Sequence, residues 1–412
     1  MPMITSKVLK RISAAAIITL LTGFAGQASA QQTLKVGAFV TASGPGADLG
    51  AQMRAGIEVA VERMSKDYTI DGKPAQVQLI WYDDEGKGDV GLSVVTRALT
   101  VDKVNVAIGF NSTDIVSRVM GDFQKASVPF VIAAAGGSKL YHMIADHKME
   151  FVFQLSPTAD DLVPSLVNAT LVGFKPKKLA ALNYNLDAPR EMVPMVMKLI
   201  MDKIPDAQVV AEEYVPFGTS DFSQQFLKLK RLGADFIYSD IYGAGAPIFF
   251  EQYNELRVPA LVSHLGTSVS ADTFVEKNGK LMNGSLINVR WVVGDYTPIS
   301  KPMAESYMKK TGQSPTAFAV QAHDTAVVML DAVRNAKSLD PKAIVAALES
   351  GNFTGAWGMR RFTNLAGGHR MPVDMTIVQI QDGKKVPVYP EEVRAKLGGK
   401  YQAVPPYSWE TH

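Results

Sequence analysis

The sequence predicts an α/β protein made of two similar halves, each with a parallel sheet covered by helices on both faces. Short apolar runs rich in β-branched residues alternate with segments whose apolar residues recur at helical spacing. The alternation starts near residue 34 and starts again after residues 151–153. Parallel strands need long crossover connections, and helical crossovers cover both faces of a sheet. The two halves repeat an architecture and not a sequence.

The first half alternates strand and helix from its first residues. Its first strand ends in the loop Ser43-Gly44-Pro45-Gly46. Strands are expected at residues 34–40, 77–82, 104–110 and 129–133, and helices at residues 49–64, 90–101 and 115–125.

The second half continues the same rhythm. Strands are expected at residues 179–184, 208–214, 236–240 and 260–263, and helices at residues 162–173, 191–203, 222–232 and 247–256. A strand at 286–293, a long helix at 317–336 and a strand at 374–381 follow, the last ending in the turn Asp382-Gly383. Residues 387–412 contain several prolines and no clear period, so we expect them to wrap the surface.

Residues 1–30 have the three parts of a secretory signal peptide. Three basic residues precede an apolar run over residues 12–25, and Ala28-Ser29-Ala30 follows. The run is shorter than the ~20 residues that span a bilayer. We expect cleavage after Ala30, which removes three of 42 basic residues and leaves 39 against 40 acidic ones. The alternative is a helix of the mature domain.

Composition excludes several classes of protein. The near-neutral charge is unlike that of nucleic-acid-binding domains, which carry a basic face. The chain has 412 residues and no cysteine, which excludes disulfides, thiolate nucleophiles, zinc–thiolate sites and iron–sulfur clusters. It also excludes a lipid-anchored cysteine at the cleavage site. No other segment reaches about 18 consecutive apolar residues. We therefore expect a soluble periplasmic protein without a membrane anchor.

The strongest indication of an enzyme is the segment from Gly44 to Gly50, which follows a strand and opens a helix. Its GxGxxxG spacing differs from the dinucleotide-binding GxGxxG. A secreted NAD(P)-dependent dehydrogenase that uses this segment remains an alternative to a loop whose amides bind another polar group.

Other catalytic and metal-binding motifs are absent from the sequence. No P-loop, nucleophile elbow or HExxH motif occurs. His142 and His147 are spaced more widely than a helical metal pair. Asp83-Asp84-Glu85 can serve acid–base chemistry or a cation, although a strand-end cluster is the interpretation that we favour. We expect no enzyme activity, no metal and no cofactor.

Several strings together resemble the Leu/Ile/Val-type periplasmic binding proteins of ABC transporters. The resemblance covers nearly the whole mature chain, in the order of the family. It is carried by Leu34-Lys35-Val36-Gly37 with Ser43-Gly44-Pro45, Asp71-Gly72 before Asp83-Asp84, residues 108–113, Val128-Pro129 with Ala133-Ala134-Ala135-Gly136, Thr219-Ser220-Asp221-Phe222, and residues 233–238.

The resemblance implies two Rossmann-like lobes joined by a three-strand hinge, with the ligand in the cleft between them. Lobe one is expected to comprise residues 31–153 and 286–362, and lobe two residues 154–285 and 363–412. Ligand contacts with both lobes would favour a closed form over an open one.

In lobe one, the family's Ser/Thr loop corresponds to Ser112 and Thr113, whose hydroxyls can bond a ligand carboxylate. Ser112 can also cap a helix. Ala134, Ala135 and Gly136 correspond to a segment that holds the polar end of the ligand through backbone groups. Leu49, at the start of the first helix, is a further candidate for a ligand contact.

In lobe two, Tyr242 corresponds to an aromatic residue that faces the cleft, although it can also pack in the core. Asn183 and Tyr184 end a strand where the family has ligand contacts. Arg190 and His264 are candidates to meet an aromatic or acidic group, and Arg190 can equally be a surface residue.

The carboxylate that pairs with a ligand ammonium in amino-acid binders corresponds to the region of Leu265. A buried ammonium without a carboxylate is costly. The sequence therefore disfavours a standard α-amino acid unless Asp240 supplies the charge.

By resemblance, the protein captures a small carboxylate-bearing solute and delivers it to an ABC permease in the inner membrane. Branched-chain amino acid-like compounds, aromatic or other organic acids, and amides are all candidates. A monomer is expected. A ligand sensor for a membrane receptor is a further alternative.

Overall fold

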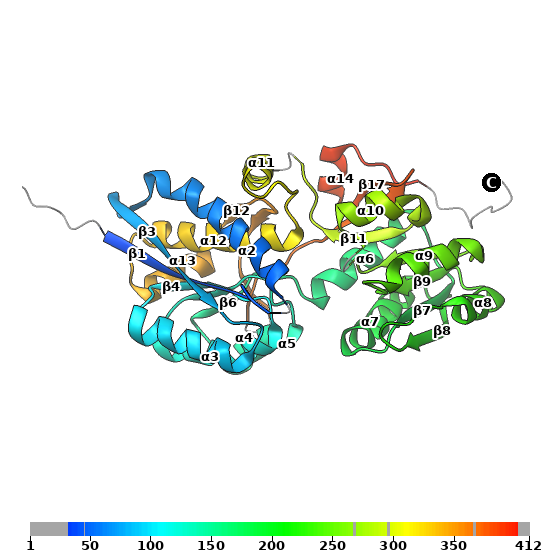
Figure 1. Cartoon of the computed structure of the whole chain (residues 1–412), viewed down its shortest axis with the longest axis horizontal. Coiled ribbons are helices and arrows are strands. Elements are labelled where there is room, and N and C mark those ends of the chain that lie inside the picture. The colour runs from blue at the N-terminus through cyan, green and yellow to red at the C-terminus, as the bar shows by residue number, and fades with distance from the viewer. Residues whose placement is uncertain (1–31, 45, 267–268, 295–296, 366–367, 403–412) are drawn as a thin grey trace, which may run out of the picture.

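The structure is a computed structural model that consists of two α/β lobes lying side by side along the long axis of the molecule (Figure 1). It describes residues 32–44, 46–266, 269–294, 297–365 and 368–402. Lobe one is built on an eight-stranded sheet and lobe two on a seven-stranded sheet. The predicted signal peptide lies outside the described residues.

The sheet of lobe one has the strand order β14-β15-β6-β5-β4-β1-β3-β2, and neighbours from β15 to β3 run parallel. Every residue of β4 and β5 is buried, as expected of parallel strands with both faces covered. The strands are β1 (Gln32–Val40), β2 (Thr69–Ile70), β3 (Lys73–Asp83), β4 (Val106–Gly109), β5 (Phe130–Ile132), β6 (Val152–Gln154), β14 (Thr363–Leu365) and β15 (Gly368–Arg370).

The helices of lobe one come from two distant parts of the chain. The long helix α12 packs against α2 and the sheet, and its Ala, Val, Met and Leu side chains are buried over most of its length. The helices are α2 (Ala47–Met64), α3 (Gly88–Arg97), α4 (Thr113–Ala126), α5 (Ser138–Asp146), α11 (Ser300–Thr311), α12 (Ala317–Ala336) and α13 (Pro341–Ser350), with the hairpin β12 (Phe353–Gly355) and β13 (Gly358–Arg360) after them.

Lobe two has the strand order β17-β16-β11-β10-β9-β7-β8, with β16 and β17 antiparallel at one edge. Its strands are β7 (Lys178–Tyr184), β8 (Gln208–Val215), β9 (Phe236–Ser239), β10 (Leu261–His264), β11 (Leu286–Arg290), β16 (Thr376–Gln381) and β17 (Lys384–Tyr389). Its helices are α6 (Ala159–Gly173), α7 (Asp187–Lys203), α8 (Ser223–Leu232), α9 (Gly245–Glu255), α10 (Asp272–Asn278) and α14 (Glu391–Leu397).

Two predicted lobe boundaries are wrong. The prediction places residues 286–362 in lobe one, but β11 pairs with β10 and β16 in lobe two. It places residues 363–412 in lobe two, but β15 pairs with β6 in lobe one. A strand at a crossing has the same apolar pattern whichever sheet it joins, so the pattern does not show where the crossing begins. Within the described residues the chain crosses after β6, β11 and β15.

Polar contacts and a hydrophobic cluster connect the two lobes at the hinge. Arg370 of β15 forms a buried ion pair with Asp161 of α6. The hydroxyl of Tyr141 on α5 donates to Asp160 Oδ2 at 2.7 Å. One cluster of buried apolar residues includes side chains of α2 and α12 together with side chains of α6 and α7. The apolar core is therefore continuous through the hinge.

The C-terminal segment is more regular than predicted. Residues 384–397 form β17 and α14 instead of an irregular wrap. β17 is an edge strand, where the missing amide of Pro387 costs little. The predicted turn at Asp382-Gly383 is confirmed: φ is 49° and 75° at the two residues, as a tight hairpin turn requires.

Candidate functional site

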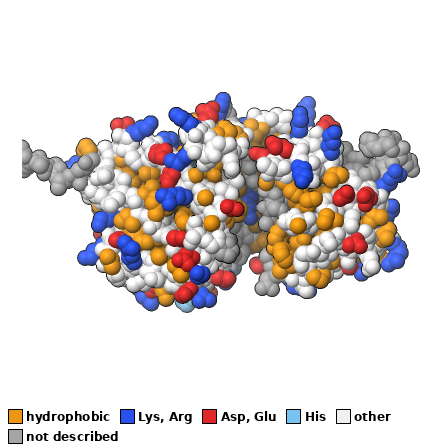
Figure 2. Space-filling model, in the orientation of Figure 1, with side chains coloured by type: hydrophobic (Ala, Val, Ile, Leu, Met, Phe, Trp, Pro, Cys, Tyr) orange, Lys and Arg blue, Asp and Glu red, His pale blue; other side chains and the backbone are white. Residues whose placement is uncertain are grey.

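The carboxyl ends of the parallel strands in both sheets lie at the interlobe boundary. β6 and β11 each end where the chain crosses to the other lobe. Because parallel strands share one direction, the loops after β1, β4 and β5 lie at this edge of lobe one, and those after β7, β9 and β10 at this edge of lobe two. The molecular surface is hollowed between the lobes (Figure 2). Ligands of open α/β sheets bind beyond the carboxyl ends of the strands.

Two acidic residues fix the loop after β1. Thr41 Oγ1 lies 2.7 Å from Asp84 Oδ1 and 2.9 Å from Asn111 Oδ1. Ser43 donates to Asp83 Oδ2 at 2.7 Å. Desolvation raises the pKa of Asp83, but the Ser43 hydroxyl and backbone amides outweigh it and lower that pKa. The loop amides thus already bind a carboxylate, which gives no support to a dinucleotide phosphate at this position.

Ser112 and Thr113 lie together at the start of α4. Ser112 caps the helix, because its Oγ accepts a hydrogen bond from the amide of Ile115 at 3.4 Å. Thr113 Oγ1 accepts one from the amide of Gly137 at 3.1 Å. Both residues are half-buried. Each hydroxyl keeps its own hydrogen, so both can still donate to a carboxylate.

The segment after β5 offers fewer free backbone groups to a ligand than predicted. The amide of Ala134 donates to a backbone carbonyl of the β4 loop at 3.0 Å, and the carbonyl of Ala135 accepts from a β6 side chain at 3.2 Å. These two groups are therefore occupied within lobe one. Gly136 is exposed, and a Cβ there would lie 2.7 Å from the carbonyl of Pro157. Glycine thus lets this loop approach the first crossing closely.

Asn183 and Tyr184 have roles inside lobe two. Asn183 is fully buried; its Nδ2 donates to the carbonyl of Tyr238 at 3.3 Å, and its Oδ1 accepts from the amide of Asp240 at 2.6 Å. Tyr184 is buried and donates to the carbonyl of Tyr242 at 3.4 Å. Both side chains hold the loop after β9 in place and are not exposed at the interlobe boundary.

His264 has a similar structural role. It is fully buried, and its Nε2 lies 3.0 Å from the carbonyl of Ile241. Its Nδ1 accepts a hydrogen bond from the amide of Gly266 at 2.9 Å, so Nε2 carries the proton. Burial lowers the pKa of His264 to about 4, with the Ile241 bond opposing the shift. The neutral ring thus ties the loops after β9 and β10 together.

The position expected for an ammonium-binding acid holds no carboxylate. Leu265 is 8% exposed and packs in the core. Gly266 has φ 89°, and a Cβ there would lie 1.8 Å from the carbonyl of Asn288. The backbone contact excludes any side chain at 266.

The aromatic residues Tyr242, Tyr184 and Phe217 gather at the ends of β7, β8 and β9. Tyr242 is half-buried, and its ring packs edge-on against Tyr184 at 5.6 Å between centroids. Phe217 lies 5.7 Å from Tyr242 and is 64% exposed. Burial, and then Asp240, raise the pKa of the Tyr242 hydroxyl. Phe217 was missed by the sequence reasoning; a large apolar residue between Pro216 and Gly218 is the signal that marks it.

Arg190 and Leu49 lie apart from this cluster. Arg190 is exposed, donates to Asn185 Oδ1 at 2.7 Å, and stacks over the ring of Tyr214 at 4.3 Å. Leu49 is half-buried against the core of lobe one. Direct ligand contact by either residue stays a prediction.

Arg290 and Phe318 form a contact between the lobes that the sequence reasoning also missed. Arg290 ends β11 with φ 61°, a left-handed conformation that is uncommon outside glycine. Its guanidinium carbon lies 4.8 Å from the ring centroid of Phe318, in the first turn of α12. Burial lowers the pKa of Arg290, and the charge of Asp240 opposes that shift.

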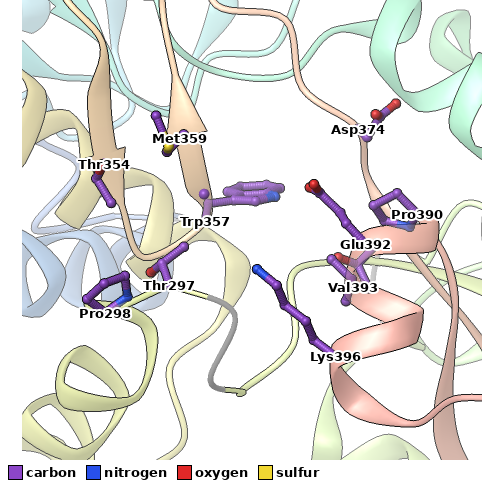
Figure 3. A pocket seen from close by; sticks show the side chains of 12 residues that line it. Thr297, Pro298, Thr354, Trp357, Met359, Asp374, Pro390, Glu392, Val393 and Lys396 are labelled. Atoms are coloured by element: carbon purple, nitrogen blue, oxygen red, sulfur yellow. The ribbon is translucent and has the colours of Figure 1, made fainter.

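A separate cavity of about 370 Å³ lies on the hinge (Figure 3). Trp357 and Met359 of the β12–β13 region form one wall, and Glu392 and Lys396 of α14 form the opposite wall. None of the sequence-predicted ligand residues lines it. The cavity therefore belongs to the hinge and not to the edge where the strands end.

Two kinds of site are not found in the part of the chain that the structure describes. No three side chains of the His, Cys, Asp or Glu type are grouped so that they could bind a metal ion. No described helix combines the length and the apolar character needed to cross a bilayer.

Sequence comparison relates the chain to known binding proteins. The profile of a family described as periplasmic binding protein matches residues 33–385. The Leu/Ile/Val-binding protein homolog 7 of Brucella abortus (strain 2308) is 25% identical over 386 residues, which cover 89% of this chain and 94% of that protein. A leucine-, isoleucine-, valine-, threonine-, and alanine-binding protein of Pseudomonas aeruginosa is 21% identical and covers 84% of this chain and 89% of its own length.

Solved structures share the fold. A substrate-binding protein of an ABC transporter from Sphaerobacter thermophilus matches with a TM-score of 0.74 at 18% identity, covering 87% of this chain and 97% of its own. A solute-binding protein from R. palustris in complex with 4-hydroxybenzoate matches with a TM-score of 0.69 at 20% identity, covering 92% and 100%. A branched-chain amino acid transporter substrate-binding protein from Streptococcus pneumoniae in complex with isoleucine matches with a TM-score of 0.67 at 19% identity. The match covers 86% of this chain and 98% of that chain.

Proposed function

The chain belongs to the periplasmic binding protein family, and from that premise we propose that it captures a small carboxylate-bearing solute between its lobes and delivers it to an ABC permease. The observation that carries the proposal is that the two lobes bring different kinds of side chain to the interlobe boundary. Lobe one brings the hydroxyls of Ser112 and Thr113 to its edge, and lobe two brings the exposed ring of Phe217 and the half-buried ring of Tyr242. Hydroxyl groups can donate to polar atoms of a small solute, and rings suit its apolar body.

Hinge closure supplies the mechanism. A solute that contacts both lobes stabilises the closed form relative to the open one by its extra contacts in that form. Three crossings connect the lobes within the described part of the chain, so a rotation about them moves one edge against the other. A permease can then distinguish the loaded protein from the empty one by its shape. No covalent step is needed.

Relatives of known ligand suggest the class of solute. One related structure holds isoleucine and another holds 4-hydroxybenzoate. Both solutes combine a carboxylate with an apolar body. A small organic acid of either kind is therefore the solute that we propose for this protein, with the periplasm as its location and the monomer as its working form. The dehydrogenase and sensor alternatives gain no support.

A ligand screen by thermal unfolding tests this proposal. The mature protein is heated with branched-chain amino acids, aromatic acids, dicarboxylates and amides in separate wells. Because a ligand that binds only the native state stabilises it by about 2.7 kcal/mol at one hundred times its Kd, a true solute raises Tm by several degrees. If no solute in any class raises Tm, the proposal is contradicted.

A further inference from the structure

We infer that Arg290 is the group that binds the carboxylate of the solute, so that the solute is a small monocarboxylate with an apolar or aromatic body and without a required ammonium. This inference rests on the proposed function and specifies the solute of that same site. The family resemblance implies that lobe one binds the carboxylate of the solute. In this inference lobe two binds it instead.

Arg290 is a cation at the edges where the strands end. Lys87, in the loop after β3, is another, but it pairs with Glu85 at 2.8 Å. The loops directly after β1, β4, β5, β7, β9 and β10 contain no Lys or Arg. Arg290 itself is the last residue of β11, where the chain leaves lobe two. Its positive charge attracts an anion to this boundary.

The guanidinium of Arg290 has no acceptor of its own. Among the described residues it makes no hydrogen bond or ion pair; it stacks over the ring of Phe318, and the charge of Asp240 acts on it. Asp240 is 5% exposed, and its backbone amide donates to Asn183 Oδ1. A half-buried guanidinium without an acceptor is costly, whereas a carboxylate can accept two parallel hydrogen bonds from it.

The surroundings of Arg290 define the rest of the solute. Phe318 lies beneath the guanidinium and belongs to lobe one, so a carboxylate on Arg290 lies between the two lobes. Phe318 is half-buried, and its accessible ring suits an apolar or aromatic body. Leu265 and Gly266 provide no carboxylate for an ammonium. The site thus fits an anion better than a zwitterion.

Calorimetric titration with benzoate, benzamide and L-leucine tests the inference. Benzoate and benzamide have the same shape and differ in charge. We expect the wild type to bind benzoate more tightly than benzamide or leucine. Arg290→Gln should weaken benzoate binding by about tenfold to hundredfold and remove the difference between benzoate and benzamide. Arg290→Lys should keep part of the affinity, because it retains the charge and loses the planar fork.

Arg54→Gln is the matched control. Arg54 also stacks over a ring, that of Trp81 at 4.6 Å, but it lies on the exposed face of α2 and pairs with Glu58. It should bind benzoate like the wild type, and circular dichroism verifies that both glutamine variants are folded. Benzoate binding by Arg290→Gln within twofold of the wild type overturns the inference. So does leucine binding that is tighter than benzoate binding and independent of Arg290; either result leaves the proposed function intact. Failure of the wild type to bind any solute contradicts the proposed function as well.

Discussion

At His264, both ring nitrogens are bonded to backbone groups of neighbouring loops, and burial lowers the pKa of the ring to about 4. The unfolded chain has a His pKa of about 6.5 and so binds a proton first as the pH falls. The stability that the neutral His264 ring contributes is therefore fully present above pH 6.5 and is lost as the pH falls from 6.5 to 4. The loss attributable to this residue is about 3 kcal/mol.

Urea unfolding at pH 7, 5 and 4 measures this loss when the wild type is compared with His264→Gln. The variant should be less stable at pH 7, because it loses the ring's hydrogen bonds. Its disadvantage should shrink towards pH 4, where the wild type has to protonate a buried ring. Parallel stability curves for the two proteins would contradict the assignment of a neutral buried ring.

Tyr242 provides a test of the aromatic edge. Tyr242→Ala removes the ring that packs against both Tyr184 and Phe217, and we expect solute affinity to fall at least about tenfold. Tyr242→Phe keeps the ring and should retain most of the affinity, since the hydroxyl is not needed for ring packing. The measurement is the Tm shift produced by the best solute of the screen. An unchanged shift in the alanine variant removes Tyr242 from the site.

At the scale of elements, one buried carboxylate holds the hairpin β12–β13 to helix α12. Asp324 accepts hydrogen bonds from the amides of Ala356 and Trp357 at 2.7 and 2.9 Å and from the ring of His323 at 2.8 Å. Asp324→Ala leaves buried amides unpaired, so we expect the free energy of unfolding to fall by about 2–5 kcal/mol. Asp340→Ala, which removes only an exposed cap of α13, should cost about 1 kcal/mol. Equal losses in the two variants would contradict this role of Asp324.

The elements show which part of the fold the sequence predicts. β4 and β5 were predicted because strands covered on both faces are apolar along their whole length. α12 was predicted because Ala, Val, Met and Leu occupy one face of a long helical segment. β17 was missed because Pro387 is typical of loops, and only the position at a sheet edge makes it tolerable. The strands β12 and β13 have three residues each, which is too short for any period to appear.

The candidate site could be proposed in part for a related reason. Ser112, Thr113 and Tyr242 follow strands at positions where the family resemblance implies ligand contacts, and their contact with a solute stays a prediction. Arg290 and Phe318 are far apart in the chain, and they meet only because the chain crosses between the lobes after β11. A contact between residues so far apart in the chain produces no local sequence pattern from which it could be predicted.

At the scale of the whole molecule, the hydroxyl of Tyr141 connects α5 of lobe one with α6 of lobe two through Asp160. Burial, and then the bond to Asp160, raise the pKa of Tyr141 to about 12, so the hydroxyl donates at any physiological pH. Tyr141→Phe removes this hydrogen bond. We expect a larger radius of gyration of the solute-free protein in X-ray scattering and a several-fold weaker affinity for the solute.

Tyr68→Phe is the matched control for that experiment. Its hydroxyl also makes a 2.7 Å hydrogen bond, but to the carbonyl of Leu330 within lobe one. The two variants should lose similar stability, about 1 kcal/mol, while only Tyr141→Phe changes the radius of gyration. A changed radius in both variants, or in neither, would mean that Tyr141 does not hold the lobes.

The hinge cavity makes the protein suitable as the basis of an optical sensor. Its two walls belong to different lobes, so the surroundings of a dye placed there change whenever the lobes rotate. Met359 lines one wall and is 75% exposed, and the natural chain contains no cysteine. Met359→Cys would therefore give a single reactive thiol, and a solvent-sensitive fluorophore on it would report solute concentration without touching the residues that hold the solute.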